Sequence, residues 1–385
     1  MGARNSARTS FRDATVLLAG VAVGTFVMHA KIFPYPLLAA AYQYVTPNEP
    51  DAEGLAALRA DLPQTLRVRS PAAADDARRL LVDFIWGQAE PPYVLPSRVQ
   101  RQWTGWPRIA AAARTDRLEI AQEFGVNSIA FHLVPKRPNG RLVIFHQGHE
   151  PQAVVPSIVS PLLEAGYSVV LLNMPLQAMN PQPLARLPGI GTVRLDSHQA
   201  LSYARPKQGR PLRFFLDPVL AVLNYTAPDY RSVAMVGHSG GGWTTTIAAA
   251  IDPRIQLSVP IAGTSPISTW SDAGDYEQTV PSLYSQVSYL DLYAMGTTNG
   301  RRQVQILNRY DPCCFPGKVL DTYRADVAKA ARSLGGTFDG LIANQRFHEV
   351  GGEAIDRVLV ELDRRRANGG RYIAKMSDPP SGKAG

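Results

Sequence analysis

The stretch VAMVGHSGGGW, from Val233 to Trp243, decides the fold because it has to turn a strand into a helix within a few residues. The short, β-branched apolar run at 232–236 is typical of a buried strand. Residues 243–250 are aromatic, β-branched or alanine and carry no charge, so they predict a buried helix that ends near Asp252-Pro253. A bend this tight needs unusual backbone angles and close contact between strand and helix, and glycine permits both.

One serine stands inside this glycine-rich turn, in the pattern Gly237-x-Ser239-x-Gly241. This pattern is typical of a nucleophile elbow, which holds a serine hydroxyl exposed at a helix N-terminus. The alternatives are a glycine-rich turn with an incidental serine, or an anion-binding loop. A nucleophilic serine needs a base, a carboxylate that orients the base, and donors for an oxyanion. The sequence should therefore supply these groups elsewhere.

Length and composition allow one large α/β domain with extensions, because the chain has 385 residues of which 45% are hydrophobic. The formal charge of +8 comes from scattered arginines without a basic stripe of interleaved aromatics, so no nucleic-acid partner is expected. The only cysteines, Cys313 and Cys314, are adjacent. Adjacent Cα atoms lie about 3.8 Å apart, below the usual disulfide span, which favours free thiols over a strained bond.

The N-terminus resembles a targeting segment. Arg4, Arg8 and Arg12 precede the uncharged run Ala14–Met28. We expect residues 1–30 to be a signal-anchor, a transmembrane helix that attaches the chain to a membrane; a cleaved signal peptide and a cytosolic apolar helix are the alternatives. The positive flank predicts an exported or membrane-anchored protein with its catalytic domain outside the cytoplasm, on the periplasmic side if the source is bacterial.

The rest of the chain divides by its pattern. Residues 31–115 form a proline- and alanine-rich N-terminal extension, and residues 368–385 a flexible tail. Between them, strands alternate with helices, which predicts an α/β domain over 116–367 with a mostly parallel sheet covered by helices on both faces. The long irregular stretches 174–212 and 264–302 are interpreted as cap insertions. The predicted strands are 117–124, 127–135, 141–145, 167–172, 232–236, 257–262, 303–307 and 338–343.

Over residues 116–367 the chain resembles the α/β-hydrolase superfamily, which implies an eight-stranded sheet and a catalytic triad. That family carries its nucleophile after the fifth strand, its acid after the seventh and its histidine after the eighth. Ser239, Asp311 and His348 follow the corresponding predicted strands in that order. His348 would take the serine proton, and Asp311 would orient the imidazole. Asp339 competes for the role of the acid, but it lies inside a strand and is interpreted as structural.

The resemblance also implies an oxyanion hole. Its first donor is the backbone N–H of Gly240, and its second lies in the loop His146-Gln147-Gly148-His149 after the third strand. We favour the N–H of His149, with Gln147 as the alternative. Two further histidines are candidate substrate contacts, His198 in the first cap stretch and His238 beside the nucleophile. His146, His149 and Glu150 are also considered as metal ligands. Their spacing differs from that of the helical H-E-x-x-H motif, so we expect neither a metal nor a cofactor.

The sequence therefore predicts a serine hydrolase that cleaves a small-molecule carboxylic ester through an acyl-serine intermediate. An acyltransferase or a peptidase or amidase on the same fold is one alternative. A non-catalytic binding protein that retains the fold is another. No residue selects the natural substrate, the acyl length or the oligomeric state.

Overall fold

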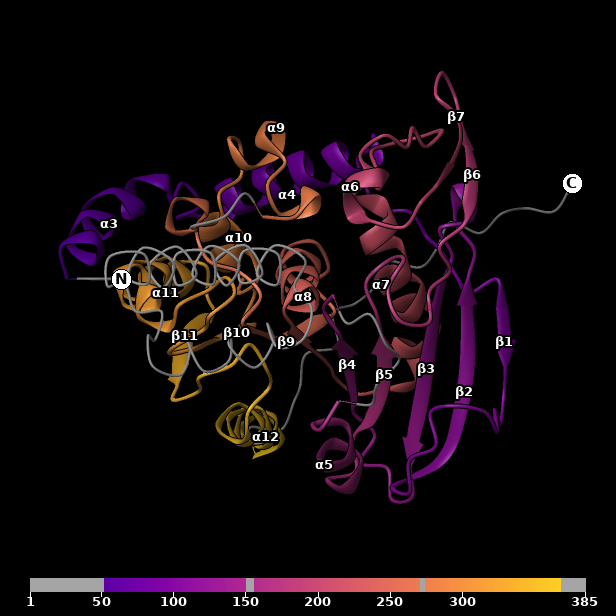
Figure 1. Ribbon diagram of the computed structural model, residues 1–385. Helices are drawn as coiled ribbons and strands as arrows, with labels where there is room; N and C mark the ends of the chain where they lie inside the picture. The colour runs from indigo at the N-terminus through magenta and orange to yellow at the C-terminus, as the bar shows by residue number, and fades with distance from the viewer. Residues whose placement is uncertain (1–51, 150–155, 271–273, 368–385) are drawn as a thin grey trace, which may run out of the picture. The chain divides into compact units, whose positions relative to one another are not determined.

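The computed structural model describes residues 52–149, 156–270 and 274–367 (Figure 1). Within this part, the central element is a nine-stranded sheet in the order β1-β2-β3-β5-β4-β8-β9-β10-β11. The strands of this sheet are β1 (Arg98–Gln100), β2 (Ala112–Ile120), β3 (Ser128–Pro135), β4 (Leu142–His146), β5 (Ser168–Leu172), β8 (Val233–His238), β9 (Ile255–Ile261), β10 (Arg302–Asn308) and β11 (Thr337–Ala343).

Six neighbouring strands of this sheet run parallel: β5, β4, β8, β9, β10 and β11. The strands β1, β2 and β3 form an antiparallel edge. The prediction of a mostly parallel sheet is thus confirmed, but the predicted number of eight strands is wrong. The additional strand is β1, which pairs antiparallel with residues 117–119 of β2. It has only three residues, two of them polar, so it shows no hydrophobic alternation that would reveal a strand.

Side chains of the parallel strands alternate between two hydrophobic clusters, one on each face of the sheet. In β4, Leu142 and Ile144 belong to the cluster that also contains α4, α7, α8, α10 and α11. Val143 and Phe145 belong to the other cluster, with α5 and α12. The predicted helices on both faces are therefore confirmed. The α-helices are α3 (Ala52–Thr65), α4 (Pro71–Trp86), α5 (Val159–Glu164), α6 (His198–Leu201), α7 (Arg213–Thr226), α8 (Gly240–Ile251), α9 (Pro281–Tyr284), α10 (Tyr289–Met295), α11 (Arg324–Ser333) and α12 (Gly352–Ala367).

The two long stretches interpreted as caps differ in structure. The first contains a hairpin of β6 (Leu184–Leu187) and β7 (Gly191–Arg194), followed by α6. The second begins with the 3₁₀ helices η3 (Ile267–Thr269) and η4 (Tyr276–Gln278) and ends in α10, which is buried along its whole length. α10 packs against α8, so this end of the stretch belongs to the core layer. The other 3₁₀ helices are η1 (Glu123–Gly125), η2 (Ala227–Asp229) and η5 (Gly317–Thr322).

The expectation of a transmembrane signal-anchor needs a correction. Among the residues that the structure describes, no helix is both long enough and apolar enough to cross a membrane. The transmembrane prediction is therefore not supported and is withdrawn. The segment on which it fell, residues 1–30, lies outside the described residues, as does the predicted tail at 368–385.

Candidate active site

Ser239 lies at the junction predicted from the sequence. β8 ends at His238, α8 begins at Gly240, and Ser239 between them has φ +54° and ψ −128°. An L-residue rarely adopts this conformation, which costs about 1–3 kcal/mol and persists only where the surroundings enforce it. The residues on either side of Ser239 are buried, whereas Ser239 itself is partly exposed. Its hydroxyl makes no hydrogen bond to any described residue and lies at the N-terminus of α8.

The glycines around Ser239 are required by close backbone contacts. A Cβ atom at Gly148 would lie 2.5 Å from Ser239 Cβ, so the loop after β4 touches the serine directly. A Cβ atom at Gly241 would overlap the backbone carbonyl of His146. The first turn of α8 and the His146–His149 loop are therefore packed backbone against backbone, an arrangement that only glycine permits.

This packing predicts that Gly241→Ala destabilises the protein, because the added methyl group meets backbone that cannot rotate away. We expect the free energy of unfolding to fall by about 1–3 kcal/mol, measured as a lower midpoint in urea. Gly352→Ala is the matched control, since no heavy atom lies within 4 Å of a Cβ placed there. Equal midpoints for the two variants would contradict the packing described.

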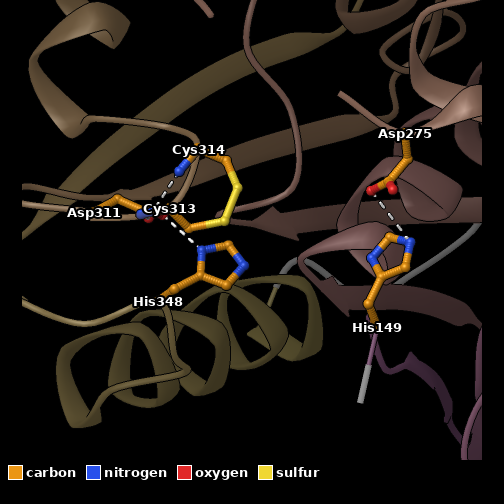
Figure 2. Close-up of a disulfide and its surroundings, with 6 residues drawn as sticks. All are labelled: His149, Asp275, Asp311, Cys313, Cys314 and His348. Atoms are coloured by element: carbon orange, nitrogen blue, oxygen red, sulfur yellow. Dashed lines mark hydrogen bonds and ion pairs between the residues drawn. A yellow bond between two sulfur atoms is a disulfide. The ribbon is translucent and has the colours of Figure 1, made fainter. Parts of the chain in front are cut away.

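His348 and Asp311 form a close pair. Asp311 follows β10 and is fully buried, and His348 follows β11. His348 Nδ1 lies 2.8 Å from Asp311 Oδ2 (Figure 2). Asn308, at the end of β10, holds the histidine loop in place, since its side-chain amide donates to the backbone carbonyls of Phe347 (2.8 Å) and Glu349 (2.9 Å), on either side of His348. The pair is thus fixed from both strands.

The other imidazole nitrogen of His348, Nε2, is buried and has no hydrogen-bond partner among the described residues. The ring of His238 packs against that of His348, with centroids 4.9 Å apart. Burial, followed by the nearby His348, lowers the pKa of His238 to about 3, so His238 is neutral near pH 7. His238 is therefore a neutral packing partner of His348.

The two cysteines correct another expectation. Cys313 and Cys314 are joined by a disulfide, with Cα atoms 3.7 Å apart, so the prediction of free thiols is wrong. The backbone N–H groups of both residues donate to the same oxygen, Asp311 Oδ1, at 2.9 and 3.2 Å. This shared acceptor holds both cysteines in one turn around the carboxylate (Figure 2). The disulfide is thus part of the scaffold that fixes Asp311.

The loop after β4 distinguishes the two predicted oxyanion donors. The N–H of Gln147 donates to the carbonyl of Leu172 at 2.9 Å, so it is already engaged. The ring of His149 lies against the first turn of α8, where a Cβ atom at Gly240 would be 2.6 Å from His149 Cε1. His146 instead points inside: it is buried, its Nδ1 bonds the Gln147 carbonyl at 2.8 Å, and burial lowers its pKa to about 4. Glu150 lies outside the described residues.

A second polar cluster adjoins this loop, and one of its members was not predicted. His149 Nε2 lies 2.9 Å from His198 Nδ1, which lies 3.0 Å from Oε1 of the fully buried Glu277. Burial disfavours the charged form of Glu277, but His198 and His149 outweigh it and hold its pKa at about 2. Burial opposes the charged form of His198 as well, yet Glu277 leaves the pKa of His198 raised. The sequence offered one signal for Glu277, because this acidic residue stands among the aromatic residues of the stretch 264–302.

The structure thus brings His348 to Asp311, His238 to His348, and His198 to His149. His198 is buried in an ion pair, which does not favour direct contact with a substrate. The catalytic and binding roles assigned to these residues stay predictions.

Comparison with known proteins gives structural matches only. No family model and no curated protein matches the sequence. A methylesterase has a TM-score of 0.57 at 15% identity, over 84% of this chain and 70% of that one. Acetyl xylan esterase 1 from Thermoanaerobacterium sp. has a TM-score of 0.52 at 15% identity, over 81% and 98%. A glucuronoyl esterase from Solibacter usitatus has a TM-score of 0.51 at 12% identity, over 79% and 95%. All three are α/β-hydrolases, and the likeness shows that this chain shares their fold.

Proposed function

We propose that this chain, which has the α/β-hydrolase fold, is a serine hydrolase that cleaves carboxylic esters through an acyl-Ser239 intermediate. The observation that carries the proposal is the 2.8 Å contact between His348 Nδ1 and the buried carboxylate of Asp311. A buried carboxylate that accepts from Nδ1 leaves Nε2 of the same ring to act as a base. The partly exposed serine at positive φ supplies the matching nucleophile.

The reaction follows from these groups. Ser239 Oγ attacks the ester carbonyl while His348 Nε2 takes its proton, and the oxyanion that forms is bound by the N–H of Gly240 and that of His149. The ester C–O bond then breaks, and His348 returns the proton to the departing alcohol. A water molecule, deprotonated by His348, attacks the acyl-serine; the bond between the acyl carbon and Ser239 Oγ breaks, His348 returns the proton to Oγ, and the acid is released. In the free protein such serine–histidine contacts are often long and tighten only with substrate bound.

The solved structures with similar folds support an ester as the substrate. Two of them are named for esters on sugars, acetyl xylan and glucuronoyl esters, and the third is named a methylesterase. We therefore propose a small ester as the substrate class. Hydrolysis is proposed over acyl transfer because the three solved structures with similar folds are named as esterases.

Short-chain p-nitrophenyl esters test this function. Because p-nitrophenolate leaves readily, these esters react even when the acyl group fits its pocket poorly. We therefore expect hydrolysis with a burst of about one p-nitrophenol per chain before the steady rate. Primary alcohols are added in competition with water to identify the acceptor, and the free acid should remain the main product. Folded protein that turns over none of several such esters, or that forms mainly the alkyl ester, would contradict the proposed function.

A further inference from the structure

The cluster of His149, His198 and Glu277 has the arrangement of a metal-binding site. Three potential ligand atoms converge: His149 Nε2 and His198 Nδ1 are 2.9 Å apart, and Glu277 Oε1 lies 3.0 Å from His198 Nδ1 and 3.3 Å from His149 Nε2. Ligand atoms bound to one tetrahedral zinc ion at about 2.0–2.1 Å are separated by about 3.3 Å. The three observed separations are close to this value.

The hydrogen bonds of His198 leave Nδ1 as the ring nitrogen that faces the cluster. His198 Nε2 lies 2.9 Å from the carbonyl oxygen of Pro175, which can only accept, so Nε2 carries a hydrogen and donates it. In the neutral ring, Nδ1 then carries a lone pair, and this lone pair faces the carboxylate oxygen of Glu277. A single proton on Nδ1 can be directed at His149 or at Glu277 but cannot serve both contacts well. One divalent cation satisfies all three atoms at once.

The surroundings of Glu277 point the same way. The residue is fully buried, and its second oxygen, Oε2, has no hydrogen-bond partner among the described residues. Oε1 is paired with His198 and His149, but no donor compensates the burial of Oε2, and a cation bound to the carboxylate would do so. Its position is also fixed by the fold, because Trp243 of α8 donates to the Tyr284 hydroxyl, which donates to the Glu277 backbone carbonyl at 2.9 Å.

We propose that His149 Nε2, His198 Nδ1 and Glu277 Oε1 bind one divalent first-row cation, in the first place Zn²⁺. Two imidazoles and one carboxylate are a ligand set that zinc accepts, with a fourth position left for water or another ligand. Asp275 lies 3.4 Å from His149 Nε2, but its side chain is 49% exposed and does not converge with all three ligand atoms, so it is not counted among the ligands. This site departs from the expectation of no metal, which considered only His146, His149 and Glu150.

The position of the site suggests what the cation would do. The ring of His149 lies against the first turn of α8 beside Ser239, and the backbone N–H of the same residue is the proposed oxyanion donor. Coordination would fix this ring and with it the loop after β4. The cation would therefore link three segments that are far apart in the sequence, the loop after β4 and both stretches interpreted as caps. The binding of metal does not depend on the proposed ester hydrolysis.

Metal content tests the proposal without any activity assay. The full chain is purified without a polyhistidine tag, treated with a chelator, and titrated with Zn²⁺ and with Co²⁺. We expect about one ion per chain, a melting temperature that rises when Zn²⁺ is added, and visible d–d absorption of the Co²⁺ form typical of a tetrahedral site. Folded chelator-treated protein that takes up none of these ions would overturn the proposal.

Variants locate the site. His149→Gln is the most informative, because this side chain is 27% exposed whereas those of His198 and Glu277 are 4% and 0% exposed. It should weaken Zn²⁺ binding at least about 100-fold, and Glu277→Gln should do the same. The matched control is His132→Gln, a buried histidine that lies 4.0 Å from a carboxylate of Asp116 outside the cluster. Equal Zn²⁺ affinity of folded His149→Gln and His132→Gln protein would contradict the assignment.

Discussion

Ser239→Ala should lower the turnover of any accepted ester by about 10⁶-fold, because it removes the only oxygen that attacks the ester carbonyl in the proposed reaction. The fold should not change. The Ser239 hydroxyl makes no hydrogen bond to a described residue, and alanine meets the same backbone conformation, so the free energy of unfolding should stay within about 0.5 kcal/mol. The measurement is kcat with a p-nitrophenyl ester, together with the urea midpoint of the same sample.

The matched control is Ser333→Ala, which removes an exposed hydroxyl on α11 that bonds the backbone of Arg69 and Ala330. Its turnover should equal that of the wild type. Folded Ser239→Ala protein that retains turnover within about tenfold of the wild type would show that another group carries out the reaction.

Asp311→Asn should lower kcat by about 10⁴-fold while the protein stays folded. The asparagine amide keeps one carbonyl oxygen for the N–H groups of Cys313 and Cys314, but it turns an NH₂ donor toward His348 Nδ1. The imidazole then carries its hydrogen on Nε2, which is the wrong tautomer for a base. The effect should appear in kcat for every ester tested, with the melting temperature measured in parallel.

Asp339→Asn is the matched control, because Asp339 was the competing candidate for the acid. Its carboxylate lies 2.5 Å from Arg357 and 3.4 Å from Arg302, in an ion-pair network between β10, β11 and α12. Although partial burial opposes it, the backbone N–H of Gly340 and the two arginines leave the pKa of Asp339 lowered. Its contribution to stability is therefore present above the unfolded pKa near 3.9 and is lost as the pH falls. This variant should lose stability near neutral pH and keep its turnover. A larger loss of turnover in Asp339→Asn than in Asp311→Asn would contradict the assignment of Asp311 as the triad acid.

Local sequence patterns were sufficient for eight of the nine strands of the sheet. A strand followed by glycines and an apolar helix leaves few ways to fold, and parallel strands bring their carboxyl ends to one edge. Ser239, Asp311 and His348 could therefore be assigned to predicted strand ends, in the order that the resemblance to the α/β-hydrolase superfamily implies. The strand β1 was not predicted, because a segment of three residues is too short to show a hydrophobic alternation.

The polar cluster beside the elbow could not be predicted from pattern. His198 and Glu277 lie in irregular segments, where no helical or strand repeat indicates which side chains face each other. Their contact depends on how both segments pack over α8, including the hydrogen bonds from Trp243 through Tyr284 to Glu277. The disulfide was missed for a related reason. The usual Cα span of a disulfide argued against it, and the bond forms although the Cα atoms are only 3.7 Å apart.

The central claim is that Ser239 is an activated nucleophile, and covalent labelling with a fluorophosphonate tests it most directly. The reagent mimics the tetrahedral state and reacts with a serine only where a base and oxyanion donors are in place. Peptide mapping by mass spectrometry should find one adduct, on Ser239. His348→Ala should abolish the labelling and Ser333→Ala should not affect it. Folded wild-type protein that resists several small fluorophosphonates, or that carries the adduct on another residue, would contradict the account.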